Sequence, residues 1–186
     1  MDESVLIAGQ GGQGILFTGK VLAHAALRAD KEVTFFPSYG AEMRGGTAHC
    51  TVIIADEPIG SPIAQIVRSL IIFNQPSLDR FVSRLHPEGL LVYDNSMIKV
   101  RSIPHTNAHG EPATEIALNE FNNKKVANMV LLGVFMRITK MFPSAIADDV
   151  FDSMQNLSPT VRSLNTKAFM RGFNATETMH PAKSTG

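Results

Sequence analysis

The chain has 186 residues, 44% of them hydrophobic, which is enough apolar material for a core and argues against disorder away from the ends. Lysine and arginine together number 17, as do aspartate and glutamate, so the net charge of zero gives no global electrostatic basis for nucleic-acid binding. Cys50 is the only cysteine, which excludes an internal disulfide and an iron–sulfur cluster held by this chain alone.

From the start of the chain we expect a cytoplasmic protein. Residues 1–3 include two acidic side chains, and the apolar run after them is too short for a signal peptide or a membrane span. We therefore expect no membrane partner and, from the charge balance, no nucleic-acid partner.

A short apolar run leads into a glycine-rich loop near the start of the chain. Residues 5–8 are β-prone, and residues 15–27 carry apolar or small side chains at helical spacing, which predicts strand, tight turn and helix. The loop residues are Gly9, Gln10, Gly11, Gly12, Gln13 and Gly14. They fit G-x-G-x-x-G, in which glycines let a ligand approach the backbone and the helix start offers N–H groups to an anion. We expect phosphate-group binding; the alternative is a turn that only packs helix against strand.

Two specific nucleotide sites fit this loop poorly. An NAD site has an acidic residue at the end of the second strand, about 20 residues further on. Here that strand, residues 32–36, runs into Pro-Ser-Tyr. A P-loop is also disfavoured, because residues 14–20 match G-x-x-x-x-G-K but Val21 stands where serine or threonine would hold magnesium.

Strand and helix patterns alternate over the first half of the chain. Further strands are predicted at residues 32–36, 47–55, 69–73 and 90–93, with an exposed strand at 98–103, a helix from Pro76 through Leu85 and a turn at 87–89. This alternation implies a mostly parallel sheet with helices on both faces, a three-layer α/β/α, Rossmann-like fold. Ligands bind beyond the carboxyl ends of such strands, so we expect convergence of the polar loops at residues 9–14, 37–46, 74–75 and 94–96.

From about residue 112 the pattern is helical. Helices are predicted at residues 114–121, 125–140, 143–154 and 159–173. The second is apolar almost all round, so we expect it to be buried inside the domain or against a partner. We expect residues 1–177 to form a single α/β domain with a C-terminal helical extension, and residues 178–186 to form a flexible tail.

No set of residues indicates catalysis or a metal site in this chain. The 6 histidines are scattered, with no pair at metal-ligand spacing on one predicted helix. Cys50 in a β-prone run is more typical of a buried small side chain than of a nucleophile. Ser38 and Tyr39 have no partner base nearby in the sequence. The sequence therefore predicts a binding chain.

Two cations could serve an anionic ligand. Lys20 lies roughly 9 Å along the helix from the loop, and helical side chains lean toward the N-terminus, so its ammonium could reach back. Arg44, followed by Gly45 and Gly46, could grip a phosphate or carboxylate with two hydrogen bonds. The alternatives are a solvated lysine, and for Arg44 an ion pair with Glu42 or an interface contact.

Three segments together resemble a known protein family. They are the glycine loop, residues 37–47 (Pro-Ser-Tyr-Gly-Ala-Glu-Met-Arg-Gly-Gly-Thr) and residues 125–133 (Lys-Val-Ala-Asn-Met-Val-Leu-Leu-Gly). They are similar to the gamma subunit of the 2-oxoacid:ferredoxin oxidoreductases. The resemblance covers nearly all of the chain up to the tail, and the middle segment is the most specific of the three.

The resemblance implies a reaction and a division of cofactors. Members of this family convert a 2-oxoacid and coenzyme A to acyl-CoA and carbon dioxide with thiamine diphosphate, and pass electrons to ferredoxin. Thiamine diphosphate, magnesium and iron–sulfur clusters are expected only in the partner alpha and beta subunits, or in a ferredoxin-like delta subunit where the complex has one. Residues 37–47 are most similar to subunits acting on 2-oxoglutarate, although relatives acting on pyruvate, branched-chain oxoacids and indolepyruvate share the glycine loop.

The resemblance also implies coenzyme A as a ligand of this chain. In single-chain pyruvate enzymes of the family, a similar glycine loop is followed by a lysine implicated in coenzyme A binding, and the matching position here is Lys20. The other expected contacts are Ser38, Tyr39, Arg44, Gly45 and Gly46, with Asn128 adding a hydrogen bond or a subunit contact. Two other functions stay open, a free-standing Rossmann-type nucleotide-binding reductase and a purely structural assembly subunit.

Overall fold

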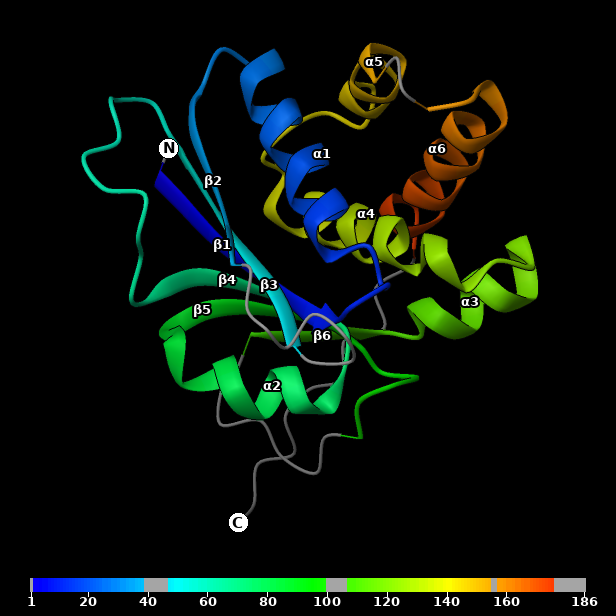
Figure 1. The fold of residues 1–186 in the computed structure, drawn as a ribbon, viewed down its shortest axis with the longest axis horizontal. Helices are drawn as coiled ribbons and strands as arrows, with labels where there is room; N and C mark the ends of the chain where they lie inside the picture. Colours follow the sequence, from blue (N-terminus) through cyan, green and yellow to red (C-terminus); the bar gives the residue numbers. More distant parts are fainter. Residues whose placement is uncertain (1, 39–46, 100–106, 155–156, 176–186) are drawn as a thin grey trace.

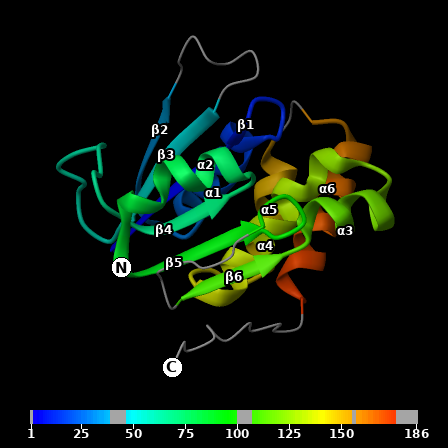
Figure 2. The same cartoon turned by 90° about the horizontal axis from the view of Figure 1, so that it is seen from below.

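The computed structural model describes residues 2–38, 47–99, 107–154 and 157–175. Within them, six strands form one sheet in the order β2-β3-β1-β4-β5-β6 (Figure 1). The strands are β1 (Asp2–Gln10), β2 (Glu32–Ser38), β3 (Thr47–Ala55), β4 (Val67–Ile72), β5 (Leu85–Asp94) and β6 (Ala108–Glu111). β4, β5 and β6 run parallel with β1, whereas β3 lies antiparallel between β1 and β2 (Figure 2). The predicted mostly parallel sheet is confirmed.

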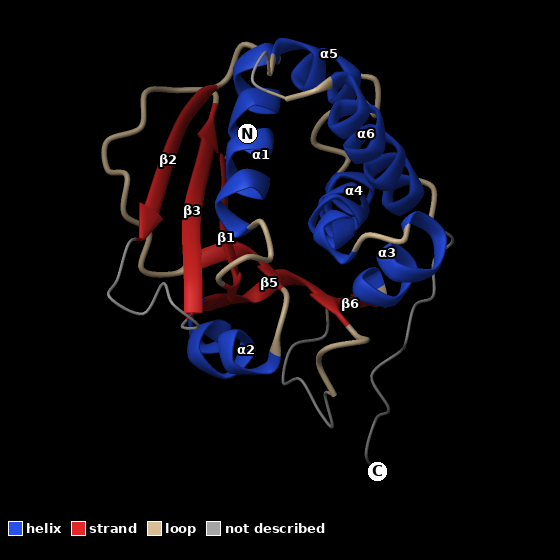
Figure 3. Cartoon of the chain, turned by 45° about the vertical axis from the view of Figure 1, so that its right-hand side comes forward, coloured by secondary structure: helices blue, strands red, loops and turns tan. Residues whose placement is uncertain are grey.

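Helices cover both faces of this sheet. The helices are α1 (Ile15–Arg28), α2 (Gln75–Phe81), α3 (Ala113–Phe121), α4 (Ala127–Thr139), α5 (Ile146–Ser153) and α6 (Pro159–Phe173), with 3-10 turns η2 (Val82–Arg84) and η3 (Lys124–Val126). α2 covers one face, while α1 and the C-terminal helices lie on the other (Figures 1 and 3). The C-terminal helices thus share a layer with α1, and the three-layer α/β/α arrangement predicted from the sequence is confirmed.

The central strand β1 is buried on both sides. Val5 and Ile7 join the apolar cluster formed with α1 and the C-terminal helices, whereas Leu6 and Ala8 join the cluster beneath α2. Strands covered on both faces have continuous apolar sequences rather than alternating ones. This explains why residues 5–8 show no polar alternation.

The predicted strand at residues 98–103 is wrong where the structure describes it. Ile98 follows a turn and is buried in the cluster beneath α2, and its N–H donates to the Asp94 carbonyl oxygen at 2.9 Å. This turn, rather than strand pairing, satisfies its backbone. The strand beside β5 is instead β6, and residues 100–103 lie outside the described part of the chain.

Element boundaries also differ around the middle of the chain. The helix predicted through Leu85 ends at Phe81, and Leu85 already pairs with Val67 as the start of β5. The predicted turn at 87–89 lies inside β5, at a register shift opposite β4. Leu85 and Leu90 pair with β4, whereas residues 86–89 have no partner in it, so the turn preference is accommodated as an irregularity within the strand. In the second half of the chain, α4 begins two residues later than predicted and α5 begins three residues later than predicted. Helix α6 has the predicted bounds.

Helices α4 and α6 cross at backbone contact distance. A Cβ added to Gly133 would collide with the carbonyl oxygen of Phe169, and one added to Gly172 would collide with that of Val130. No side chain larger than hydrogen therefore fits at either position. This crossing holds the outer helix α6 on the buried helix α4.

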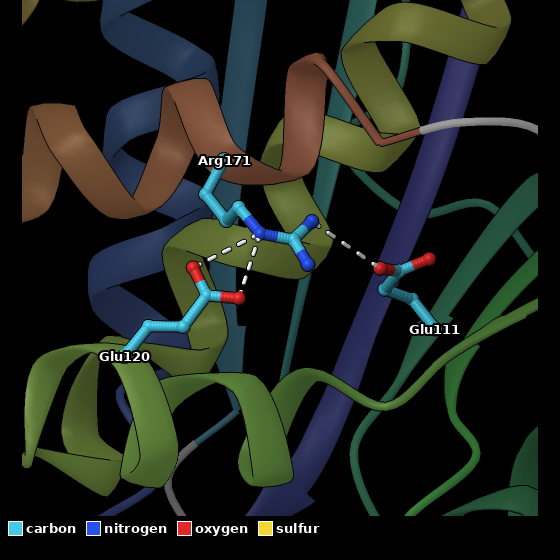
Figure 4. Close-up of polar contacts among 3 residues, drawn as sticks. All are labelled: Glu111, Glu120 and Arg171. Atoms are coloured by element: carbon cyan, nitrogen blue, oxygen red, sulfur yellow. Dashed lines mark hydrogen bonds and ion pairs between the residues drawn. The ribbon is translucent and has the colours of Figure 1, made fainter.

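An ion-pair cluster fastens α6 to α3 and β6 (Figure 4). The Arg171 Nε lies 2.9 and 3.0 Å from the two carboxylate oxygens of Glu120, and its Nη1 lies 3.9 Å from Glu111 Oε1. Glu111 is only 8% exposed. Burial raises the pKa of Glu111 above its usual value of 4.5, and the Coulombic attraction of Arg171 and Arg137 opposes this shift only in part.

We predict that Glu111→Gln changes how stability depends on pH. Because the pKa of Glu111 is raised in the folded state, the fold binds more protons than the unfolded chain above pH 4.5, so stability is lost as pH rises through the folded pKa. Glutamine keeps the shape without titrating. The free energy of unfolding of the wild type should therefore fall relative to Glu111→Gln between pH 4.5 and 7. A difference that stays constant over this range in urea titrations would contradict the assignment.

Candidate functional site

The polar loops predicted to converge do so in the described part of the chain. β1, β2, β4 and β5 point the same way, so the residues after them lie along one edge of the sheet. The side chain of Gln13 ties two of these loops together. Its Oε1 accepts from the Gln10 backbone N–H at 2.6 Å and from Asn74 Nδ2 at 3.4 Å. Asn74 in turn caps the start of α2 through the Ser77 N–H at 3.0 Å.

The last glycine of the loop has a conformation and a neighbour that demand glycine. Gly14 has φ +77°, a left-handed value that costs an L-residue about 1–2 kcal/mol. An added Cβ would also overlap the Asn128 side chain. Its carbonyl oxygen accepts from Thr18 N at 2.9 Å, Thr18 Oγ1 at 3.0 Å and Asn128 Nδ2 at 3.3 Å. Asn128 thus connects the loop to α4.

Helix α1 begins directly at this loop with its first N–H groups uncapped. No side chain caps it, and its first turn has no acidic residue. The N-terminus of a helix carries a partial positive charge of about half an elementary charge and N–H donors without helical partners. Gly12, with φ +92°, has no atom within 4 Å of the place where a Cβ would stand. The loop backbone is therefore open to an approaching anion.

A cleft of about 370 Å³ opens beside the loop. Its lining consists of Gln10, Gly11, Gly12, Gln13, Phe73, Met97, Thr114, Lys124, Lys125 and Ala127. The lining includes two lysines and no carboxylate. Backbone donors and cations without a competing acid are the features expected of a phosphate or carboxylate site.

A second cleft of about 400 Å³ shares Gly12 and Lys125 with the first. It lies against the C-terminal helices and is mainly apolar, lined also by Gly14, Phe17, Asn123, Val126, Asn128, Leu157, Val161, Leu164 and Asn165. The glycine loop therefore separates a cationic cleft from an apolar one.

Asp94 at the end of β5 builds one side of the first cleft. It is fully buried, and its Oδ2 accepts from Thr114 N at 3.0 Å and Thr114 Oγ1 at 2.5 Å, so it caps the start of α3. Its Oδ1 accepts from Ser96 N at 3.1 Å and Ser96 Oγ at 2.5 Å. The Met97 N–H donates to its carbonyl oxygen at 3.1 Å. Asp94 therefore positions Thr114 and Met97, both of which line the cleft.

The structure brings together only part of the predicted site. Lys20 is exposed on α1 and lines neither cleft. Ser38 ends β2, paired with His49, whose other partner across the sheet is Ala8. Tyr39, Arg44, Gly45 and Gly46 lie outside the described residues. Asn128 is buried and uses its side chain within the fold, where Oδ1 also accepts from Met129 N at 2.8 Å.

Sequence reasoning missed two cations beside the loop. The sequence predicts Lys125 only as the start of a helix in a family-like segment and assigns nothing to Lys124, whereas the structure places both at the first cleft. A signal was present in the sequence, since two adjacent lysines precede a helix that is otherwise apolar. Adjacent lysines are usually solvated, so the signal was weak without the fold.

Cys50 is a structural residue. It is fully buried beneath α1, with Sγ 3.6 Å from the Ile15 carbonyl oxygen, and burial raises the pKa of its thiol to about 12. A thiol with so high a pKa is not a nucleophile near neutral pH. Among the residues that the structure describes, no group of three or more histidine, cysteine or acidic side chains could hold a metal ion. No helix in this part of the chain is long and apolar enough to cross a bilayer.

The sheet order argues against a dinucleotide site of the usual kind. In the Rossmann fold the strand beside the first is parallel to it and ends in the acidic residue that holds the ribose. Here that neighbour is β3, which is antiparallel and presents its first residue, Thr47, opposite Gln10. Among the described residues, Thr47 rather than a carboxylate stands beside the end of β1.

Residues 4–175 match the family model of the pyruvate ferredoxin/flavodoxin oxidoreductases. The chain belongs to this family. The ketoisovalerate oxidoreductase subunit VorA of Methanothermobacter marburgensis is 41% identical over 134 residues, which are 72% of this chain and 28% of VorA. This oxidoreductase-family chain therefore matches a little over a quarter of the length of that relative.

Solved structures extend the comparison to whole gamma subunits. The gamma subunit of the keto/oxoacid ferredoxin oxidoreductase from Geobacter sulfurreducens has a TM-score of 0.78 at 27% identity, covering 92% of this chain and 96% of that one. The 2-oxoglutarate:ferredoxin oxidoreductase from Magnetococcus marinus was solved with 2-oxoglutarate, coenzyme A and succinyl-CoA bound. It has a TM-score of 0.82 at 26% identity, and the match covers 92% of this chain and 30% of that one. The resemblance to gamma subunits of this oxidoreductase family is confirmed.

We predict that Asp94→Asn destabilises the fold by about 3 kcal/mol, because an amide can accept for only one of the two donor pairs and hydrogen bonds to a charged group contribute about 1.5–3 kcal/mol each. Asp149→Asn, at an exposed position on α5, is the matched control and should change the free energy of unfolding by less than about 0.5 kcal/mol. Urea unfolding followed by circular dichroism measures both. Equal stabilities of the two variants would contradict the structural role of Asp94.

Proposed function

We propose that this chain is the gamma subunit of a multi-subunit 2-oxoacid:ferredoxin oxidoreductase and that its glycine-loop cleft binds the phosphate groups of coenzyme A. One observation carries this proposal. The glycine loop, which has an open backbone at Gly12 and leads into the uncapped start of α1, lines a cleft that also has two lysines and no carboxylate. A diphosphate fits this donor set, because backbone N–H groups and ammonium groups both bind anionic oxygens.

Cofactor chemistry is assigned to other chains in this proposal. Coenzyme A supplies the thiol that accepts the acyl group, and the residues of this chain hold and orient its phosphates. Cys50 is buried with a raised thiol pKa, so we place the iron–sulfur clusters, together with thiamine diphosphate and magnesium, in the alpha, beta or delta partners. Ferredoxin is the proposed electron acceptor of the complex. Co-purification under oxygen-free conditions should recover a thiamine diphosphate-binding chain.

The remaining predicted site residues belong to this proposal. Lys20 lies on the exposed side of α1, where a ligand or a partner subunit can reach it. Ser38 lies at the same edge of the sheet as the loop. Tyr39, Arg44, Gly45 and Gly46 follow Ser38 in sequence and complete the proposed contacts with coenzyme A or with a partner.

The preferred 2-oxoacid is 2-oxoglutarate. This choice is supported by the likeness of residues 37–47 to subunits acting on that acid, and by the 2-oxoglutarate-specific name of the Magnetococcus structure. The name of the VorA relative points to ketoisovalerate as the competing substrate. Initial rates of the purified complex with both acids distinguish them, and a higher kcat/KM for ketoisovalerate would overturn the preference.

We predict that Gly12→Ala in the assembled complex raises the KM for coenzyme A about tenfold with little change in kcat. An added methyl group would project into the open side of the loop and displace a phosphate from the backbone donors; losing one charge-assisted hydrogen bond costs about 1.5 kcal/mol or more. Gly60→Ala controls for an added methyl group in open space away from the cleft, whereas the left-handed backbone, with φ +92°, is specific to Gly12. Lys20→Ala should raise the same KM if that lysine contacts the ligand.

Size-exclusion chromatography must show that each variant assembles. Unchanged KM values for Gly12→Ala in an intact complex would contradict coenzyme A binding by the loop and would favour a purely structural assembly subunit. An unchanged value for Lys20→Ala alone would remove only that residue from the site.

A further inference from the structure

Lys124 and Lys125 are held at the mouth of the first cleft by the turn that contains them. They belong to η3, between α3 and α4, and the Asn123 side chain accepts from the Lys125 backbone N–H at 3.1 Å. Both lysines are exposed. Lys125 lines the cationic cleft and the apolar cleft, so it lies where the two meet.

The charge of these lysines is not balanced within the described part of the chain. Three other cations there have carboxylate partners, namely Lys31 with Asp56 at 2.7 Å, Arg162 with Asp152 at 3.6 Å and Arg171 with Glu120 at 2.9 Å. Neither Lys124 nor Lys125 has such a partner among the described residues. An uncompensated cationic pair beside a cleft favours a ligand with more than one negative charge.

The surrounding helices add to this potential. Thr114, Ala127 and the glycine loop place the starts of α3, α4 and α1 at the same cleft. The Asp94 carboxylate occupies the start of α3. The start of α1 has neither a side-chain cap nor an acidic residue in its first turn. At the start of α4, in contrast, the Ala127 N–H donates to the Lys124 carbonyl oxygen and the Met129 N–H to Asn128 Oδ1. The anion therefore has room at the start of α1.

The proposed reaction decides which end of coenzyme A stays on this chain. The thiol end must reach thiamine diphosphate, which the proposed function places in a partner subunit. The nucleotide end therefore remains at the phosphate site. The second cleft suits it, because Phe17, Leu164 and Val161 offer apolar contact for a flat base while Asn123 and Asn165 offer amide donors and acceptors.

We infer that Lys124 and Lys125 bind the phosphates of the nucleotide end of coenzyme A, and that the adjoining apolar cleft holds its adenosine. This inference rests on the proposed function. The inference goes beyond the proposed function because it names the cations, the end of coenzyme A that this chain binds and the cleft that receives the adenine base.

The test uses the assembled complex and adenosine 3′,5′-bisphosphate, a fragment with the nucleotide end and no thiol. The fragment should inhibit the wild type in competition with coenzyme A, whereas pantetheine should not. In the double variant Lys124→Gln, Lys125→Gln, both the KM for coenzyme A and the inhibition constant of the fragment should rise about tenfold or more, with kcat unchanged. Val161→Glu, at a 42% exposed position in the apolar cleft, should also weaken the binding of the fragment.

Lys167→Gln is the matched control, because Lys167 is an exposed helical lysine that lines neither cleft. If the double lysine variant keeps the wild-type KM for coenzyme A and the wild-type inhibition constant of the fragment, while Gly12→Ala raises the KM, the inference is overturned and the proposed function stays intact. Wild-type constants in both would overturn the two together. Competitive inhibition by pantetheine with none by the nucleotide fragment would overturn the orientation.

Discussion

The carbonyl oxygen of Gly14 accepts hydrogen bonds from both the backbone and the hydroxyl of Thr18 and from the side chain of Asn128. This contact depends on the missing Cβ of Gly14 and on its left-handed backbone, since any side chain would overlap Asn128. It joins the start of α1 to α4, and α4 is anchored in turn by its glycine crossing with α6. The η3 turn that carries Lys124 and Lys125 directly precedes α4. This contact therefore helps to fix the position of both lysines relative to the loop, together with the apolar packing of α1 on α4.

Charge is divided between structural and accessible positions at the carboxyl edge of the sheet. The buried carboxylate of Asp94 is satisfied by Ser96 and Thr114 and neutralises the start of α3. The starts of α1 and α4 are left without acids, and the nearby cations are exposed lysines. A chain with zero net charge thus contains a locally positive cleft, because its acidic residues lie elsewhere or are already bonded.

Much of the fold could be predicted from periodicity, because residues 5–8 and the helix α6 have patterns that tertiary packing does not override. The glycine loop could also be predicted, since the left-handed backbone at Gly12 and Gly14 is a local property that favours glycine. The exceptions have non-local causes. The strand expected at residues 98–103 is absent at Ile98 because Asp94 turns the chain into the core. Residues 87–89 lie within β5, at a register shift opposite β4, rather than between two elements. Lys124 and Lys125 could not be assigned because residues such as Gly14 and Asn128, 114 positions apart, meet only in the folded chain.

We propose that the loop from Gly9 to Gly14 binds the phosphates of coenzyme A. A structure of the assembled complex with coenzyme A bound tests this most directly. We expect phosphate oxygens within about 3.2 Å of backbone nitrogens in the loop or at the start of α1, with a lysine of η3 at a similar distance. Coenzyme A bound entirely to partner subunits, with partner side chains filling the cleft beside Gly12, would contradict it.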